Sequence, residues 1–346
     1  MNTSDRVFLT GATGFIGSHV LEALCAAGFP VIALARPGSN LARVRTLPAE
    51  VRFGDIRDLA SVCQAMRGAT QVIHTAALAG DWGSWEAFRQ TNVAGTLNVL
   101  EASRLEGISY VTMTGSISSY GEEDCSHAKD ESSPYRSHHP YFLHRLLPSG
   151  FNRYRDSKAL ATQQAIAFAR EHSMNLTVLE PVWVYGEREF GTGFYAYVKA
   201  VQGGQRFMPG SARNLFHVIY AADLAQAYVL ATQKKLAGIE RIIVGSAESQ
   251  PMHRVFGLFC RQAGLAPARP LPKWICYPLG FVLELAYSLA RARRPPLLTR
   301  GRVNMFYDSI QYATGKARRA LGFECRYTLE EGVRRTVGWY KANQYL

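Results

Sequence analysis

The chain has 346 residues, of which 47% are apolar and 19% are charged, and this composition excludes an intrinsically disordered protein. The length suits one large α/β domain, or one domain with a smaller lobe. A formal net charge of +12 favours an anionic partner or ligand, such as nucleic acid, acidic lipid or a phosphorylated molecule, without choosing among them. The six cysteines are scattered without a C-x-x-C spacing, so we expect reduced core thiols instead of a disulfide framework or a zinc ribbon.

Short β-branched runs alternate with amphipathic helical patterns through the first half of the chain. Strands are predicted at residues 7–10, 31–35, 51–53, 72–75, 110–114, 176–179 and, further along, 241–244. Helices are predicted at residues 15–27, 87–105 and 154–171. This alternation predicts βαβ units and therefore an α/β fold with a Rossmann-type, doubly wound parallel sheet.

Beyond Pro181 the segments lengthen and become richer in glycine, proline and aromatic residues. We expect residues 1–180, with 214–250 returning to the same sheet, to form a dinucleotide-binding Rossmann domain. Residues 181–213 and 251–346 would form a smaller, mostly helical substrate-binding lobe. Such a lobe would cover the carboxyl ends of the strands, where doubly wound sheets bind their ligands.

A long polar loop, or lid, is predicted at residues 122–152, because this stretch holds three prolines and shows no clean period. Its possible metal ligands are Cys125, His127, His138, His139 and His144. Their spacings match no known ligand frame, and histidines in a polar loop are usually solvated. We therefore predict no metal site.

A glycine-rich turn follows the first strand and opens the first helix, with the spacing G-x-x-G-x-x-G. Glycines permit a tight turn and the close approach of a pyrophosphate, and a helix N-terminus offers free N–H groups and a positive dipole end. Glycine triplets also mark plain turns, but the strand before and the helix after favour a dinucleotide site. The residues assigned to it are Gly11, Gly14, Phe15, Ile16 and Gly17.

The end of the second strand bears on the choice between NADP and NAD. A site for NAD usually places an acid here to bind the ribose 2′-OH, whereas Arg36 suits a 2′-phosphate. This favours NADP, although an Arg36 that only lines the loop mouth would leave NAD usable. Asp55 could face the adenine amino group, or could merely cap the following turn. Ile56 and Ala76 are the remaining cofactor contacts predicted from this half of the chain.

Tyr154 and Lys158 form a Y-x-x-x-K pair at the start of a predicted helix, where a spacing of four places both side chains on one face. A nearby ammonium lowers the pKa of a phenol, which is otherwise a poor base at neutral pH. Tyr154 could then exchange a proton with an alcohol while hydride moves to or from a nicotinamide. Ser116, after the fifth strand, could hold the same oxygen. We discount a second match, Tyr195 to Lys199, because it lies beyond the sixth strand.

Six segments together resemble the extended short-chain dehydrogenase/reductases, and they occur in the right order along nearly the whole chain. They are TGATGFIG at 10–17, HTAA at 74–77, TNVAGT at 91–96, TGSISSYG at 114–121, YRDSK at 154–158 and PVWVYG at 181–186. The resemblance implies that Ser116, Tyr154 and Lys158 are the catalytic residues and that Lys158 also binds the nicotinamide ribose. It further implies that Pro181 and Val184 wall the nicotinamide.

The C-terminal half most resembles the 3β-hydroxysteroid dehydrogenase branch, which includes sterol-4-carboxylate 3-dehydrogenases and related reductases of long-chain β-keto or β-hydroxy acids. The matching segments are 214–225, 297–299, 316–323 and 329–340. This resemblance implies an enzyme that interconverts a secondary alcohol and a ketone on a hydrophobic substrate. One departure is Glu180, which stands where the family commonly has an arginine.

Two other functions are weighed against this one. Nucleotide-sugar epimerases usually carry Arg-Asp where this chain has Asn214-Leu215, and dehydratases place an acidic pair where Ile117-Ser118 stands. The epimerase hypothesis nevertheless stays open as the alternative enzyme. A cofactor-bound scaffold or sensor is the alternative outside catalysis, and an intact serine, tyrosine and lysine argue against it.

The expected partner is a hydrophobic small molecule and not nucleic acid, because the basic residues are dispersed and no recognition motif is present. We expect neither a signal peptide nor a spanning helix, since the nearest apolar run, 274–290, contains Glu284 and is shorter than ~20 residues. Residues 274–294 are apolar and end in arginines, so they could contact a membrane peripherally, pack on the lobe or form a homodimer interface. A cytoplasmic protein is expected, with contact at the inner face of a membrane left open.

Overall fold

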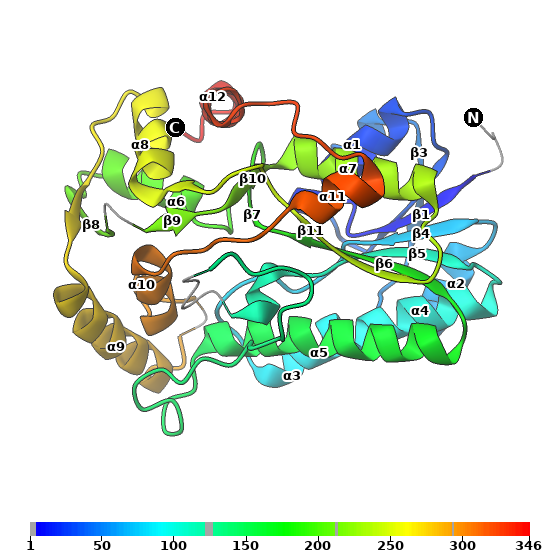
Figure 1. Ribbon diagram of the computed structural model, residues 1–346, viewed down its shortest axis with the longest axis horizontal. Helices are drawn as coiled ribbons and strands as arrows, with labels where there is room; N and C mark the ends of the chain where they lie inside the picture. The colour runs from blue at the N-terminus through cyan, green and yellow to red at the C-terminus, as the bar shows by residue number, and fades with distance from the viewer. Residues whose placement is uncertain (1–4, 122–126, 212–213, 293) are drawn as a thin grey trace.

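A seven-stranded parallel sheet forms the centre of the computed structural model, which describes residues 5–121, 127–211, 214–292 and 294–346 (Figure 1). Its strand order is β11-β6-β5-β4-β1-β2-β3, and every neighbouring pair is parallel. The strands are β1 (Val7–Thr10), β2 (Val31–Ala35), β3 (Ala49–Phe53), β4 (Gln71–His74), β5 (Tyr110–Thr114), β6 (Asn175–Pro181) and β11 (Ile239–Val244). The predicted Rossmann-type, doubly wound fold is confirmed.

The strand order reverses beside β1, which pairs with β2 on one side and with β4 on the other. Chain connections leave the sheet in opposite directions from this point, at the carboxyl ends of β1 and β4. Doubly wound sheets generally bind their ligands outside the carboxyl ends of the strands at such a switch point. The fold therefore brings the segments that follow β1, β4 and β5 to one edge of the sheet.

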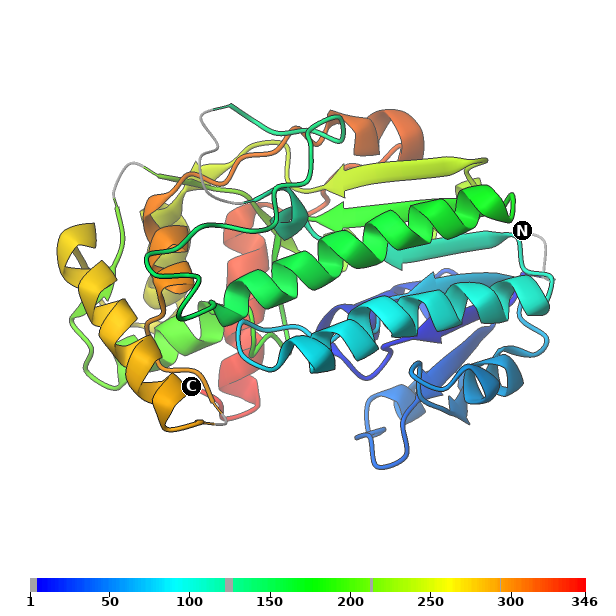
Figure 2. The same ribbon diagram turned by 90° about the horizontal axis from the view of Figure 1, so that it is seen from below.

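Helices cover both faces of the sheet, as Figure 2 shows for the lower face. One face carries α1 (Phe15–Ala26) and α7 (Ala221–Lys234), which pack on each other. The other carries α2 (Leu59–Met66), α4 (Gly95–Leu105) and α5 (Gly150–Glu171). Each face has its own cluster of buried apolar residues, because the parallel strands are buried on both sides.

The helix predicted at residues 87–105 is a helical run with a π-helical turn inside it. It comprises α3 (Trp85–Phe88), the π-turn (Arg89–Ala94) and α4. Asn92 lies in the π-turn, where its Oδ1 accepts a 2.7 Å hydrogen bond from the Leu78 N–H and its Nδ2 donates to Ser157 Oγ at 2.9 Å. Asn92 therefore joins this helix to the loop after β4 and to α5.

Most of the remaining chain lies beyond the carboxyl ends of the strands and is mostly helical, as expected, whereas the helix at residues 315–321 packs against α7 and β11 (Figure 1). It contains α6 (Phe194–Gln202), α8 (Met252–Ala263), α9 (Lys273–Leu289), α10 (Arg300–Tyr307), α11 (Gly315–Leu321) and α12 (Leu329–Ala342). Three short strand pairs accompany them: β7 (Trp183–Tyr185) with β10 (Val218–Tyr220), β8 (Phe207–Pro209) with β13 (Arg269–Leu271), and β9 (Leu215–Phe216) with β12 (Gln250–Pro251). The exact boundaries between a Rossmann domain and a lobe stay a prediction.

The predicted lid differs from its expected limits. Residues 122–126, with Cys125, lie outside the described part of the chain, and α5 begins at Gly150, so it takes in the last predicted lid residues. Between 127 and 149 the backbone forms turns and a single bridge from Lys129 to Tyr312. Across the described residues, we find no helix with the length and apolar character needed to cross a bilayer.

Candidate active site

The glycine-rich turn is too tight to hold side chains at two of its positions. Gly11 has a φ of +78°, and a Cβ built on it would lie 2.6 Å from Thr75 Oγ1 and 2.7 Å from the Ala76 nitrogen. A Cβ on Gly17 would lie 2.0 Å from the Gly11 carbonyl oxygen. The absence of side chains lets β1 pass into α1 directly against the end of β4.

The N-terminus of α1 is free to bind an anion. Gly14 is its N-cap residue and provides no side-chain cap, and the first turn, which begins Phe15-Ile16-Gly17, contains no acidic residue. Its backbone N–H groups and the positive end of the helix dipole therefore suit a phosphate. These features fit the pyrophosphate of a dinucleotide cofactor.

Two arginines flank the carboxyl ends of β2 and β3. Arg36 follows β2 and is exposed, while Arg57 holds the Asp55 carboxylate with an ion pair of 2.6 Å. The Arg57 guanidinium keeps the pKa of Asp55 below its usual range, and the charge of Arg36 acts in the same direction. The predicted Asp55 carboxylate thus has Arg57 as its partner. Arg57 was not among the predicted residues, although its place two positions after Asp55 within one turn is the signal that could have found it.

Four further residues predicted to contact the cofactor lie at the same edge of the sheet. The Ala76 N–H follows β4 and donates to Thr10 Oγ1 at 3.2 Å, and Ile56 is buried against Gly95. Pro181 is the last residue of β6, and Val184 lies in β7 within a buried cluster that also includes residue 12. Their contacts with a cofactor stay a prediction.

The helix α5 carries Tyr154 and Lys158 to the end of β5. Lys158 is buried, and its Nζ donates a 2.7 Å hydrogen bond to the carbonyl oxygen of Thr114, the last residue of β5. Ser116 lies two residues further along, begins a short 3₁₀ turn that packs against α5, and places its Oγ 2.6 Å from Ser118 Oγ. The Tyr154 ring packs edge-on against Phe88, with the ring centroids 6.3 Å apart. Helix α5 and the end of β5 therefore position all three predicted catalytic residues.

Burial controls the charges near this edge. It lowers the pKa of Lys158 to about 8, although the negative charge of Glu180 acts against this shift. It also lowers the pKa of His74 to about 3, with the charge of Lys158 acting in the same direction. The His74 ring is therefore neutral and serves as a bridge, with Nδ1 2.7 Å from Thr10 Oγ1 and Nε2 3.1 Å from Thr96 Oγ1.

A buried polar network surrounds Glu180, the residue that departs from the family pattern. Its carboxylate accepts hydrogen bonds from Tyr120 Oη at 2.6 Å and from Tyr135 Oη, and Arg241 Nε lies 3.5 Å away. Burial raises the pKa of this carboxyl, and Arg241 opposes the shift. A Cβ on Gly115 would lie 2.6 Å from Glu180 Cγ, so the network packs directly on the backbone between Thr114 and Ser116. Sequence reasoning found the departure but not these partners.

Two alternatives from the sequence can be placed in the structure. Tyr195 and Lys199 lie in α6, where Tyr195 Oη donates to the Tyr345 carbonyl and Lys199 Nζ donates to Gln202 Oε1. Both side chains of this second Y-x-x-x-K pair therefore have hydrogen-bond partners that lie outside β5 and α5. Within the described ranges, no three histidine, cysteine, aspartate or glutamate side chains gather in a way that could hold a metal ion.

Comparison with known proteins agrees with this geometry. A sequence profile described as the NAD dependent epimerase/dehydratase family matches residues 7–245. The 2-alkyl-3-oxoalkanoate reductase of Shewanella oneidensis is 28% identical over 344 residues, which cover 96% of this chain and 85% of the reductase. The 3 beta-hydroxysteroid dehydrogenase type 7 of Mus musculus is 27% identical over 366 residues, with coverages of 96% and 95%. The solved UDP-glucose 4-epimerase of Thermus thermophilus in complex with NAD is 27% identical, has a TM-score of 0.71 and covers 97% of this chain and 99% of its own.

Proposed function

The chain belongs to the NAD-dependent epimerase/dehydratase family, and on this basis we propose that it interconverts a secondary alcohol and a ketone on a hydrophobic substrate. It is an NAD(P)-dependent oxidoreductase of the extended short-chain type. The substrate we propose is a long-chain β-keto or β-hydroxy acid, or a 3β-hydroxysteroid. The scaffold or sensor hypothesis is set aside, because the matching family and the named relatives are enzymes.

One contact supports the redox chemistry more than any other. Lys158 Nζ is fixed on the Thr114 carbonyl, one helical turn from Tyr154 and two residues before Ser116. A buried ammonium held at this point lowers the pKa of a neighbouring phenol, because it stabilises the phenolate. Tyr154 is then able to take up or release a proton near neutral pH.

The proposed step moves one proton and one hydride away from the substrate alcohol. In oxidation, the alcohol O–H proton passes to the Tyr154 phenolate oxygen, and the hydrogen on the same carbon leaves with its electron pair. A bound nicotinamide cofactor would supply the acceptor for that hydride, and the substrate carbon would become a ketone carbon. Ser116 Oγ donates a hydrogen bond to the substrate oxygen, and Lys158 stabilises the phenolate. The reduction is the reverse of this sequence.

The activities named for two relatives support the hydrophobic substrate. The reductase of Shewanella oneidensis and the mouse hydroxysteroid dehydrogenase are both matched over 96% of this chain, so the similarity extends through the C-terminal helices as well as the sheet. A second candidate is a nucleotide-sugar epimerase, which the likeness to the Thermus thermophilus enzyme favours. The epimerase would remove and return the same hydride, with no net change in the cofactor.

For the cofactor we propose NADP ahead of NAD. Arg36 is exposed at the end of β2, and neither of its neighbours in the sequence, Ala35 and Pro37, is an acid that could bind a ribose 2′-OH. Arg57 belongs to the same cluster of charges, because both arginines lower the pKa of Asp55. Two guanidinium groups at this edge suit a 2′-phosphate.

The test of the reaction is a substrate panel followed at the absorbance band of the reduced nicotinamide. Purified protein is given NADP or NAD with 3-hydroxysterols, long-chain β-hydroxy acids or nucleotide sugars, and each product is analysed by mass spectrometry. We expect net cofactor reduction with a sterol or an acyl alcohol. A sugar converted to its isomer without net cofactor change would instead establish the epimerase.

The role of Tyr154 is tested by Tyr154→Phe, which removes the hydroxyl and keeps the ring packed on Phe88. We expect turnover to fall by about 10²-fold or more, as loss of a general acid/base does. Cofactor affinity, measured by fluorescence titration, should be preserved. The second tyrosine supplies a matched control, since Tyr195→Phe should leave turnover unchanged. A Tyr154→Phe enzyme with near wild-type turnover would remove the proposed mechanism.

A further inference from the structure

Helix α9 buries its one carboxylate and exposes its apolar side chains. The buried residues Cys276, Gly280 and Glu284 recur every four positions and form a single stripe, which packs against α10 at Gly280. The exposed apolar residues are Trp274, Ile275, Leu279, Val282, Tyr287 and Leu289. A helix on the surface of a water-soluble protein normally shows the reverse pattern, with its apolar stripe turned to the core. The outward face of α9 is therefore suited to an apolar environment.

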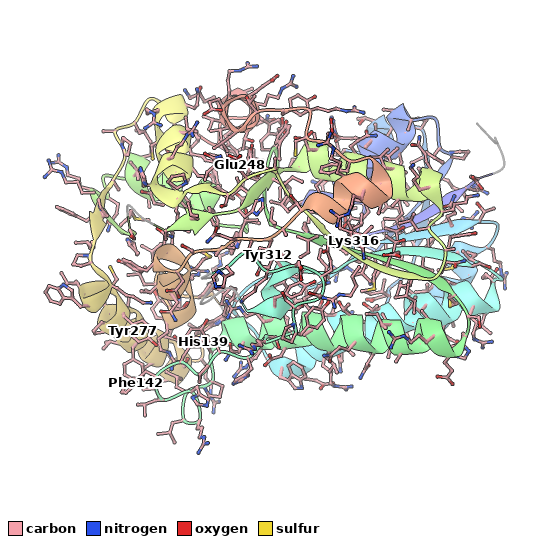
Figure 3. The ribbon with its side chains drawn as sticks, viewed as in Figure 1. His139, Phe142, Glu248, Tyr277, Tyr312 and Lys316 are labelled. Atoms are coloured by element: carbon pink, nitrogen blue, oxygen red, sulfur yellow. The ribbon has the colours of Figure 1, made fainter. Side chains whose placement is uncertain are left out.

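The tip of the lid extends this apolar face. Phe142, Leu143 and Leu146 are exposed, and the Phe142 ring packs edge-on against Phe281 with the centroids 5.4 Å apart. The Phe142 N–H also donates to Tyr277 Oη at 3.3 Å, and Figure 3 shows these two residues next to each other. We call the exposed residues of 142–146 and of α9 the lid–α9 surface. Trp274, Leu289 and Leu146 are 76%, 77% and 81% exposed, so the surface is open over its whole length.

The lid–α9 surface is held in place by a buried arginine. Arg300, at the start of α10, pairs with Glu284 at 2.9 Å. It also donates to the carbonyl oxygens of Phe142 and, at 2.6 Å, of Leu147. One guanidinium therefore fixes the lid tip to α9, and this contact holds the exposed leucines of the lid in position.

Basic residues outnumber acidic ones around the lid–α9 surface, where Asp308 pairs with Lys273 and Asp81 pairs with Arg302. Segments 132–155 and 272–307 contain ten lysine and arginine residues and a single acid, the buried Glu284. Arg145, Arg291 and Arg294 are exposed, and among the described residues none of them forms an ion pair with a carboxylate. An apolar surface edged by free arginines complements a bilayer with anionic headgroups.

We propose that the lid–α9 surface docks on an anionic lipid bilayer. The exposed leucines and Trp274 would lie in the interface between headgroups and acyl chains, and the three free arginines would contact the headgroups. Single exposed apolar residues are ordinary on proteins, but a continuous apolar surface built from two separate segments marks an interaction site. This proposal goes beyond the redox function and does not depend on which substrate is used.

The first test measures sedimentation of the full-length protein with vesicles of phosphatidylcholine, alone or mixed with phosphatidylglycerol. We expect binding only to the anionic vesicles at low salt, and weaker binding at high salt. Leu146→Asp/Leu289→Asp should weaken vesicle binding at least about tenfold, since two apolar anchors are lost. Leu105→Asp is the matched control, because Leu105 is also exposed but ends α4, at the other end of the molecule from α9 (Figure 1).

A second pair of variants separates a local charge effect from a change in net charge. Arg145→Gln, Arg291→Gln and Arg294→Gln together remove the three arginines of the surface. Arg45→Gln, Arg170→Gln and Arg319→Gln remove three exposed arginines elsewhere. We expect only the first triple variant to lose most of its affinity for anionic vesicles, while circular dichroism shows both to be folded.

The orientation is tested through Trp274. Lipids brominated near the headgroup should quench the tryptophan fluorescence of the bound wild-type protein, and Trp274→Phe should bind equally but lose most of that quenching.

Failure to bind anionic vesicles at low salt, or binding unaffected by the leucine and arginine variants, would overturn the proposal. So would a leucine variant whose only effect, measured by light scattering, is to split a dimer, because the surface would then join two copies of the chain. Because no substrate is added, these outcomes are independent of the proposed reaction.

Discussion

At the scale of single residues, the proposed preference for NADP rests on Arg36 and Arg57. Arg36→Ala is expected to weaken NADP binding by about tenfold or more and to leave NAD binding nearly unchanged, because only NADP carries the 2′-phosphate. Fluorescence titration of both cofactors measures the two affinities. Arg45→Ala, at another exposed arginine nearby in the sequence, serves as the control. An equal loss of affinity for NADP and NAD would exclude the 2′-phosphate role of Arg36.

His74 provides a prediction about acid stability. Its pKa is lowered to about 3 in the folded protein, whereas an unfolded histidine titrates near ~6.5. Between these pH values the histidine binds a proton in the unfolded chain but not in the native protein. The free energy of unfolding therefore decreases as the pH falls from about 6.5 towards 3. At pH 5 this amounts to about 2 kcal/mol relative to pH 7.

The measurement is urea unfolding of wild type and His74→Gln at pH 7 and pH 5. The variant should lose about 2 kcal/mol less than wild type between the two pH values. Burial also lowers the pKa of His19 and His217. The His74→Gln variant keeps both residues, so it should still lose some stability as the pH falls. The exposed His253→Gln should behave like wild type. A His74→Gln protein with the full wild-type pH dependence would refute this assignment.

Glu180 shows the limit of residue-by-residue inference. The sequence identifies it as a departure from the family, and the neighbouring motif places it at the end of β6. Its partners Tyr120, Tyr135 and Arg241 come from three other segments of the chain, and no local spacing connects them. Only the folded chain shows that a carboxylate at this position is accompanied by an arginine on the adjacent strand β11.

At the scale of elements, the attachment of the lid to α9 and α10 depends on the buried pair of Arg300 and Glu284. Arg300→Met should lower the free energy of unfolding by about 3–5 kcal/mol, because it leaves Glu284 buried without its counter-charge. Replacing both residues, as Arg300→Met/Glu284→Leu, should recover part of that loss, since a buried pair exchanged for apolar residues costs little. Urea denaturation of the three proteins measures the difference.

Recovery should be incomplete, because the carbonyl oxygens of Phe142 and Leu147 lose their donor in both variants. Limited proteolysis should accordingly cut residues 142–147 faster in both variants than in wild type. A double variant as unstable as Arg300→Met would show that the lost lid contacts, and not the unpaired carboxylate, dominate the energy.

At the scale of the whole molecule, cofactor binding should stabilise the fold. A ligand that binds only the native state at 100 times its Kd adds about 2.7 kcal/mol. We expect NADP to raise the Tm in differential scanning fluorimetry more than NAD does. In Gly17→Ala the shift should disappear, because the added Cβ would collide with the Gly11 carbonyl and distort the turn. Unchanged Tm values with both cofactors in wild type would contradict the assigned dinucleotide site.

The sequence by itself determined the sheet, the glycine turn and the spacing of Tyr154 and Lys158. These features are local: a strand buried on both faces is a short run of β-branched and other apolar residues, a helix brings together positions four apart, and a tight turn excludes side chains. Its errors were also local. The short α2 and the π-turn around Asn92 were missed, and α5 begins four residues before Tyr154.

The tertiary structure decided which distant groups meet. It placed Lys158 on the Thr114 carbonyl, enclosed Glu180 with two tyrosines, and turned the apolar face of α9 outward beside the lid tip. An apolar helix has the same sequence pattern whether its stripe meets the core or the solvent. Which face of α9 is buried depends on what packs against it, here Arg300 and α10. These residues come together with α9 only in the folded chain.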